Sequence, residues 1–260
     1  MQRLSEYRTV AFVVATYAAY ALGCTVAAFY VDDLGVSTQT VLMGAGWTPA
    51  VLSVAFRLAF SEGVSDTGWS PIPGKPGWAG LILVPVAVFT SACLIVDLQG
   101  TLTFEVPPDA WVGILLNLLL NSLFVFGEEF AWRGYLQSRI IDRVGVWKGL
   151  VLMSFVWAFW HVPLDLMGYG YPGFEPAIGA FVLRPIAMLG TGMVVGLIYY
   201  KTESIWYACL AHGANNMMGG RIGEYFDFTG AESKDVLLWV TAINAIVGLG
   251  LVAYVWASED

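Results

Sequence analysis

The sequence predicts an all-α polytopic membrane protein in which about eight transmembrane helices enclose a water-accessible cavity. Of the 260 residues, 58% are hydrophobic and only 12% are charged, and the mean hydropathy is +0.69. This composition is too apolar for a soluble globular domain. Several stretches free of Asp, Glu, Lys and Arg are as long as the ~20 residues that a spanning helix needs. No sizeable polar segment lies outside the expected helices, so residues 1–260 are expected to form one integral membrane domain.

Three helices are expected in the N-terminal part of the chain, at about 9–31, 38–60 and 77–97. Each contains a stretch without charged residues. The first is longer than a signal-peptide core and is followed by further spans, so we expect it to be retained. Pro and Gly are frequent in Ser65–Trp78, which predicts a loop between the second and third helices.

Five more helices are expected at about 108–141, 148–166, 177–200, 203–219 and 236–257. The fourth helix of the chain contains the apolar run Trp111–Phe126. A Pro- and Gly-rich segment, Tyr169–Pro176, predicts a loop between the fifth and sixth helices. The last helix contains Val236–Ser258, which again has no charged residue.

The basic residues lie at alternate connections. Arg3 and Arg8 precede the first helix, whereas the connections after the first, third and fifth helices contain no Lys or Arg. The positive-inside rule therefore places the N-terminus in the cytoplasm, and with eight spans the C-terminus too, in a multi-pass protein of the cell membrane. The last external connection fits least well, because it carries Arg221 and Lys234 beside four acidic residues.

The net charge of −8 argues against nucleic acid as a partner. An acidic, lysine-poor surface suits the high-salt cytoplasm of a halophilic prokaryote, and an ordinary acidic membrane protein is the alternative. Cys24, Cys93 and Cys209 all fall within expected spans without paired spacing. We expect them to pack in the interior, and they support neither a disulfide framework nor a thiolate metal site.

Ionisable residues inside membrane helices are costly and usually face a cavity or a partner. The chain has two histidines, His161 and His212, and both fall inside expected helices, while Glu128 closes an apolar run. Counted from cytoplasmic basic residues, Glu128, His161 and His212 lie roughly 16, 20 and 16 Å along their helices. Counting from Arg133 would instead place Glu128 close to the cytoplasmic surface.

Two pairs of polar residues are four positions apart and share a helix face: Glu129 with Arg133, and His212 with Asn216. Each has a purely structural alternative, as a packing histidine, a helix-end ion pair or an interhelical hydrogen bond. Their occurrence at a matching depth favours a common site. Arg184 is expected to have a separate structural role, paired with a carboxylate or a loop carbonyl.

This residue set predicts a peptide hydrolase without a covalent nucleophile. Glu128, aided by His161, would take a proton from water as that water attacks a peptide carbonyl. His212 and Asn216 would donate hydrogen bonds to the resulting oxyanion. The cation beside Glu129 would keep this second carboxylate ionised.

Three alternatives use different chemistry. Zinc bound by Glu128, His161 and His212 ranks second, because the spacing is not HExxH and each helix supplies one ligand-type residue; we therefore expect no cofactor. A serine mechanism lacks a GxSxG motif. A proton-coupled transporter could use the same residues as a relay, although the inverted repeats that favour transport are not visible in the sequence.

Three motifs resemble those of the CAAX-protease and bacteriocin-processing family, also called Abi or type II CAAX prenyl endopeptidases. Its EExxxR motif is matched by EEFAWR at Glu128–Arg133. Its FxxxH motif is approximated by WAFWH at Trp157–His161, with Trp in place of Phe. Its HxxxN motif is matched by HGANN at His212–Asn216. The motifs occur in the family order, and the catalytic motif region covers about 117–219.

The resemblance implies an eight-helix intramembrane glutamate protease whose cavity opens toward the cytoplasm. Glu128 and His161 would activate water, His212 and Asn216 would stabilise the oxyanion, and neighbouring Glu129 and Arg133 would support them. In the eukaryotic branch the substrate is a prenylated CaaX protein, which loses its last three residues. The expected partners are therefore membrane lipids and a membrane-associated or prenylated peptide. Earlier views of the family keep zinc as an alternative, and a non-catalytic immunity or scaffold member is another.

Overall fold

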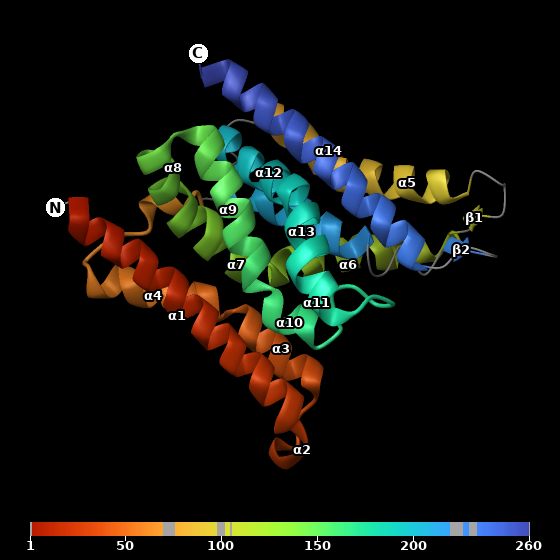
Figure 1. Ribbon diagram of the computed structural model, residues 1–260, viewed down its shortest axis with the longest axis horizontal. Helices are drawn as coiled ribbons and strands as arrows, with labels where there is room; N and C mark the ends of the chain where they lie inside the picture. The colour runs from red at the N-terminus through yellow and green to blue at the C-terminus, as the bar shows by residue number, and fades with distance from the viewer. Residues whose placement is uncertain are drawn as a thin grey trace.

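The computed structural model describes residues 2–69, 76–97, 102–104, 106–218, 226–228 and 233–259, and helices dominate it (Figure 1). In chain order the elements are α1 (Gln2–Phe29), α2 (Val31–Leu34), α3 (Thr38–Gly46), α4 (Thr48–Ala59), the short 3₁₀ helices η1 (Ser65–Thr67) and η2 (Pro76–Leu83), α5 (Val84–Val96), β1 (Leu102–Phe104), α6 (Ala110–Phe124), α7 (Phe126–Ala131), the π-helical turn η3 (Trp132–Gln137), α8 (Ser138–Val144), α9 (Val146–Trp160), α10 (Val162–Leu166), α11 (Pro176–Ile178), the π-helical turn η4 (Gly179–Leu183), α12 (Arg184–Thr202), α13 (Ile205–Met217), β2 (Phe226–Phe228) and α14 (Ser233–Glu259).

The all-α polytopic membrane fold is confirmed, and the protein is an integral membrane protein. Among the described residues, six helical segments are long and apolar enough to cross a membrane: Tyr7–Phe29, Thr38–Ala59, Gly77–Val96, Ala110–Val144, Pro176–Thr202 and Lys234–Ser258. The fifth and seventh expected helices are present as α9 and α13, which are shorter than a span needs. The number of eight spans therefore stays a prediction.

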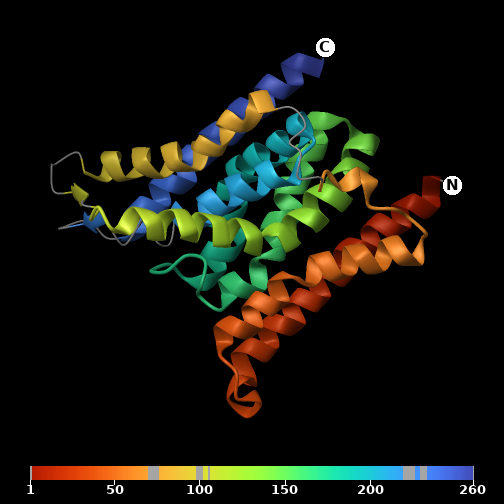
Figure 2. The same cartoon turned by 180° about the vertical axis from the view of Figure 1, so that it is seen from behind.

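Helix α12 lies at the centre of the bundle. In the membrane-spanning segment that contains it, Pro176–Thr202, 67% of the apolar part is buried inside the protein. The pair α1 and α4 lies on one side of the bundle and the pair α5 and α14 on the other (Figures 1 and 2). Two glycines let neighbouring helices approach α12 closely. A Cβ on Gly190 would clash with the main-chain carbonyl of Asn244 in α14, and one on Gly192 would clash with Ser154 in α9. Such small residues are typical of tightly packed membrane helices.

The connections between the helices contain one strand pair that was not expected and a loop that was. β1 and β2 form a short antiparallel pair in which Leu102 lies opposite Phe228, and no sequence pattern predicted this pair. The segment Tyr169–Pro176 is a loop up to its last residue, where α11 begins. Of the other expected loop, residues 70–75 lie outside the described residues, as does Arg221. The three cysteines are buried and unpaired.

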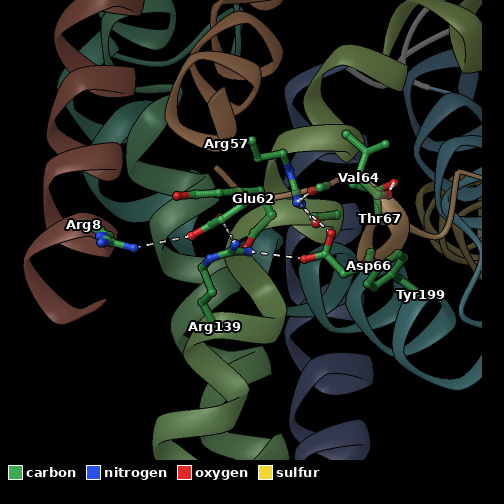
Figure 3. Close-up of polar contacts among 11 residues, drawn as sticks. Arg8, Arg57, Glu62, Val64, Asp66, Thr67, Arg139 and Tyr199 are labelled. Atoms are coloured by element: carbon green, nitrogen blue, oxygen red, sulfur yellow. Dashed lines mark hydrogen bonds and ion pairs between the residues drawn. The ribbon is translucent and has the colours of Figure 1, made fainter. Parts of the chain in front are cut away.

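A network of charged side chains joins the loop after α4 to the turn η3 (Figure 3). The buried Arg57 donates to Asp66 Oδ1 at 2.7 Å, to the Gly134 carbonyl at 2.7 Å and to the Gly63 carbonyl. Arg139 of α8 pairs with Glu62 at 2.5 Å and with Asp66 at 3.8 Å. The network therefore holds α4 and its following loop against the segment that comes directly after the EEFAWR motif.

Replacement of Arg57 by Ala should destabilise the fold by about 2–3 kcal/mol, because the Gly134 carbonyl loses a charged donor inside the protein. Arg8→Ala is the matched control. Arg8 belongs to the same network, but it is half-exposed and pairs with Glu62 at only 3.8 Å, so its loss should cost less than about 1 kcal/mol. Thermal unfolding of both variants in detergent measures the difference. Equal midpoints for the two variants would contradict the anchoring role of Arg57.

Candidate active site

The three sequence motifs lie on helices that meet in the interior. Glu128 and Glu129 belong to α7, and Arg133 lies in the turn η3. His212 lies in α13. His161 lies at the break between α9 and α10, which Pro163 favours because its nitrogen cannot donate to the carbonyl four residues earlier.

The Glu129 carboxylate is completely buried and joins two helical segments. Its Oε1 accepts a hydrogen bond from Arg133 Nη1 at 3.0 Å and a second one from His212 Nδ1 at 2.8 Å. The pairing with Arg133 follows from the four-residue spacing. The contact with His212 joins residues 83 positions apart, so sequence spacing gave no signal for it.

The Glu128 carboxylate is held by a different residue. Its Oε2 accepts a hydrogen bond from the indole Nε1–H of Trp157 at 3.0 Å, and 7% of the Glu128 residue is exposed. The guanidinium carbon of Arg133 also lies over the Trp157 ring, 4.2 Å from its centroid. The His212 ring meets the Trp157 ring in a T-shaped arrangement, with centroids 4.7 Å apart. Trp157 thus contacts residues of all three motifs, whereas the sequence marked it only as a departure from the FxxxH motif.

The hydrogen bonds of the two histidines fix which ring nitrogen carries a proton. His161 Nδ1 lies 2.8 Å from the main-chain carbonyl of Trp157. A carbonyl only accepts, so Nδ1 is the donor. His212 Nδ1 donates in the same way to the Glu129 carboxylate. In both rings Nε2 is the nitrogen that remains for other partners.

The polar atoms of this cluster divide into sealed and open ones. Glu129 Oε2 and Arg133 Nε and Nη2 are buried without a hydrogen bond. Glu128 Oε1 and the Nε2 atoms of His161 and His212 also have no hydrogen bond among the described residues, but they are not among the sealed atoms. The free atoms of Glu128 and of both histidines are therefore the ones that remain accessible.

Two expected contacts are absent from the part of the chain that the structure describes. Glu128 and His161 share no direct hydrogen bond and are connected through Trp157. Asn216 lies one turn after His212 in α13, is exposed, and has no hydrogen bond to the cluster. Among the described residues, contacts thus connect Glu128, Glu129, Arg133, His161 and His212. Asn216 makes no hydrogen bond to this cluster.

The metal-binding alternative has no convergent ligand set. Within the described residues, no group of three or more His, Cys, Asp or Glu side chains is placed to hold a metal ion. Glu128 instead has one carboxylate oxygen bonded to an indole N–H.

Two further residues border the cluster. Arg184 pairs with Asp165, with Nε–Oδ2 at 2.9 Å and Nη2–Oδ1 at 2.6 Å, which confirms the carboxylate partner expected from the sequence. Tyr20 of α1 stacks on Trp160 with ring centroids 3.9 Å apart, and the Trp160 ring in turn meets the His161 ring in a T-shaped arrangement with centroids 4.9 Å apart. No motif lies in α1, so sequence reasoning missed Tyr20.

The two adjacent carboxylates should respond differently to replacement. Glu129→Gln removes the negative charge that pairs with the buried Arg133 and should destabilise the fold by roughly 3–5 kcal/mol. Glu128→Gln keeps an acceptor oxygen for Trp157 and should change stability by less than about 1 kcal/mol. Thermal unfolding of both variants in detergent compares them. A larger loss for Glu128→Gln would contradict the structural role of Glu129.

Residues 107–218 match a family model described as Type II CAAX prenyl endopeptidase Rce1-like. The matched segment contains all three motifs and the whole contact cluster around Trp157. A comparison with curated proteins finds no match. This match supports the family expected from the motifs: residues 107–218 are similar to the type II CAAX prenyl endopeptidases, whose members are CAAX-type intramembrane proteases.

Proposed function

We propose that this protein is an intramembrane endopeptidase in which Glu128 and His161 activate the water that hydrolyses a peptide bond. One observation carries the proposal. Glu128 Oε1, His161 Nε2 and His212 Nε2 have no hydrogen bond among the described residues and are not fully buried, whereas Glu129 Oε2 and the Nε and Nη2 atoms of Arg133 are fully buried. The groups of the cluster that are free to bind a substrate and a water molecule are thus a general base, a second proton acceptor and an oxyanion donor.

In the proposed reaction, Glu128 accepts a proton from water while the water oxygen attacks the peptide carbonyl carbon. His161 holds its Nδ1 proton on the Trp157 carbonyl, so its Nε2 accepts a hydrogen bond from the same water. The tetrahedral intermediate then collapses, and Glu128 returns the proton to the leaving amine. No covalent enzyme intermediate is formed.

The oxyanion of the intermediate is proposed to be stabilised from α13. When the His212 ring carries protons on both nitrogens, Nδ1–H is donated to Glu129 and Nε2–H is available to the oxyanion. Asn216 lies one turn further along the same helix, and its exposed amide would supply a second donor. Glu129 and Arg133 support this arrangement by fixing the His212 ring.

The proposed substrate is a CaaX-type or other membrane-associated peptide, prenylated where the partner carries a lipid. The match of residues 107–218 to the family model supports this substrate class, and the surrounding lipids are proposed as the other partner. The match also favours proteolysis over a proton-coupled transporter. Arrangement of the base, the histidines and Trp157 in one cluster favours catalysis over a non-catalytic immunity or scaffold role.

Replacement of the water-activating residues should abolish the reaction. Glu128→Ala and His161→Ala are each expected to lower cleavage of a farnesylated CaaX-type peptide in detergent by at least about 100-fold, as is typical for loss of a general base. Arg8→Ala, which removes a half-exposed charge that pairs with Glu62 at 3.8 Å and forms no hydrogen bond or ion pair with the cluster in the described part of the chain, should retain the wild-type rate. Thermal unfolding checks that the variants are folded. Full activity of Glu128→Ala would overturn the proposed mechanism.

Chelation separates the two ways of activating water. Because no three metal ligands converge among the described residues, phenanthroline should leave the rate of peptide cleavage unchanged. Metal analysis of the purified protein should find less zinc than protein. Stoichiometric zinc that is lost together with activity would favour the metal-dependent mechanism instead.

A further inference from the structure

We propose that the indole N–H of Trp157 positions the Glu128 carboxylate for water activation, which makes Trp157 a positioning residue of this site. The inference rests on the proposed function of Glu128. It concerns a residue in which this chain departs from the FxxxH motif of the family, since a Phe ring at the same position has no N–H to donate.

The hydrogen bond is specific among the tryptophans around the site. Trp132, Trp157 and Trp160 are all buried. Within the described part of the chain, the indole nitrogens of Trp132 and Trp160 have no hydrogen-bond partner, whereas that of Trp157 lies 3.0 Å from Glu128 Oε2. Proximity of a buried indole to polar residues is thus not enough for the contact, and Trp157 is the one oriented toward a carboxylate.

The position of the indole is fixed from several directions. The guanidinium carbon of Arg133 lies over its ring, 4.2 Å from the centroid, and the His212 ring meets it in a T-shaped arrangement with centroids 4.7 Å apart. The main-chain carbonyl of the same residue accepts the His161 Nδ1 proton. A donor held this firmly restricts the rotation of the carboxylate that it binds.

Occupation of Oε2 has a direct chemical consequence. Glu128 Oε2 is committed to the indole, and Oε1 is the oxygen that remains accessible. The proton from water is therefore taken by Oε1. A donated hydrogen bond also favours the ionised carboxylate over the protonated acid, and only the ionised form is a base.

Trp157→Phe tests the inference, because it keeps an aromatic ring and the main-chain carbonyl but removes the N–H. We expect kcat for the farnesylated CaaX-type peptide to fall roughly 10- to 100-fold, the loss of a hydrogen bond to a charged group. KM should stay within about twofold, since substrate contacts remain. The acid side of the pH–rate profile should move to higher pH.

Trp132→Phe is the matched control. It removes the same ring area from a buried position, but its indole N–H has no partner to lose. We expect kcat, KM and the pH–rate profile of this variant to match the wild type. A kcat loss and a pH shift as large in Trp132→Phe as in Trp157→Phe would overturn the inference, because a general packing effect would then explain both.

A second variant covers the case in which Trp157→Phe does not fold. β-(3-Benzothienyl)alanine at position 157 has the shape of tryptophan with sulfur in place of the N–H, and the same kinetic changes are expected. Glu128→Ala is assayed alongside. Activity in Glu128→Ala would overturn the proposed function, whereas an inactive Glu128→Ala with wild-type kinetics at position 157 would overturn only the role of Trp157.

Discussion

A carboxylate buried in a membrane helix is tolerated only where donors surround it, and the rest of this site depends on how Glu129 meets that condition. Arg133 on the same helical segment supplies one donor, and His212 on α13 supplies the other. The second bond holds α13 against α7 and fixes the orientation of the His212 ring. Gly190 and Gly192 of α12 stabilise the same bundle, because they let α14 and α9 approach α12 closely.

Adjacent positions on a helix point about 100° apart, and this geometry gives the two glutamates different environments. Glu129 faces α13 and is sealed. Glu128 faces α9, where Trp157 takes one oxygen and leaves the other accessible. One carboxylate thereby supports the structure and its neighbour is free for chemistry. A single glutamate could not do both, because a carboxylate engaged by two donors is a poor base.

The local features of this protein could be predicted from its sequence, and the long-range ones could not. Charge-free runs located the helices, and four-residue spacing located the Glu129–Arg133 pair. Contacts of His212 with Glu129 and of Trp157 with Glu128 join residues 83 and 29 positions apart, and these depend on how helices pack, which periodicity does not encode. The motif resemblance predicted that Glu128, His161 and His212 belong to one site. It did not predict a hydrogen-bond donor at position 157, where the family motif has Phe.

The π-helical turn η3 explains why an ion network outside the motifs belongs to the architecture of the site. A π-turn disturbs the regular pairing of main-chain N–H and C=O groups in its helix, and inside a protein each such group needs a partner. Arg57 donates to the Gly134 carbonyl and Gln137 donates to the Gly196 carbonyl of α12. The turn that contains Arg133 is therefore fixed to α4 on one side and to α12 on the other. Because Arg133 lies in this turn and contacts both Glu129 and Trp157, the position of each carboxylate depends on anchors that lie outside the three motifs.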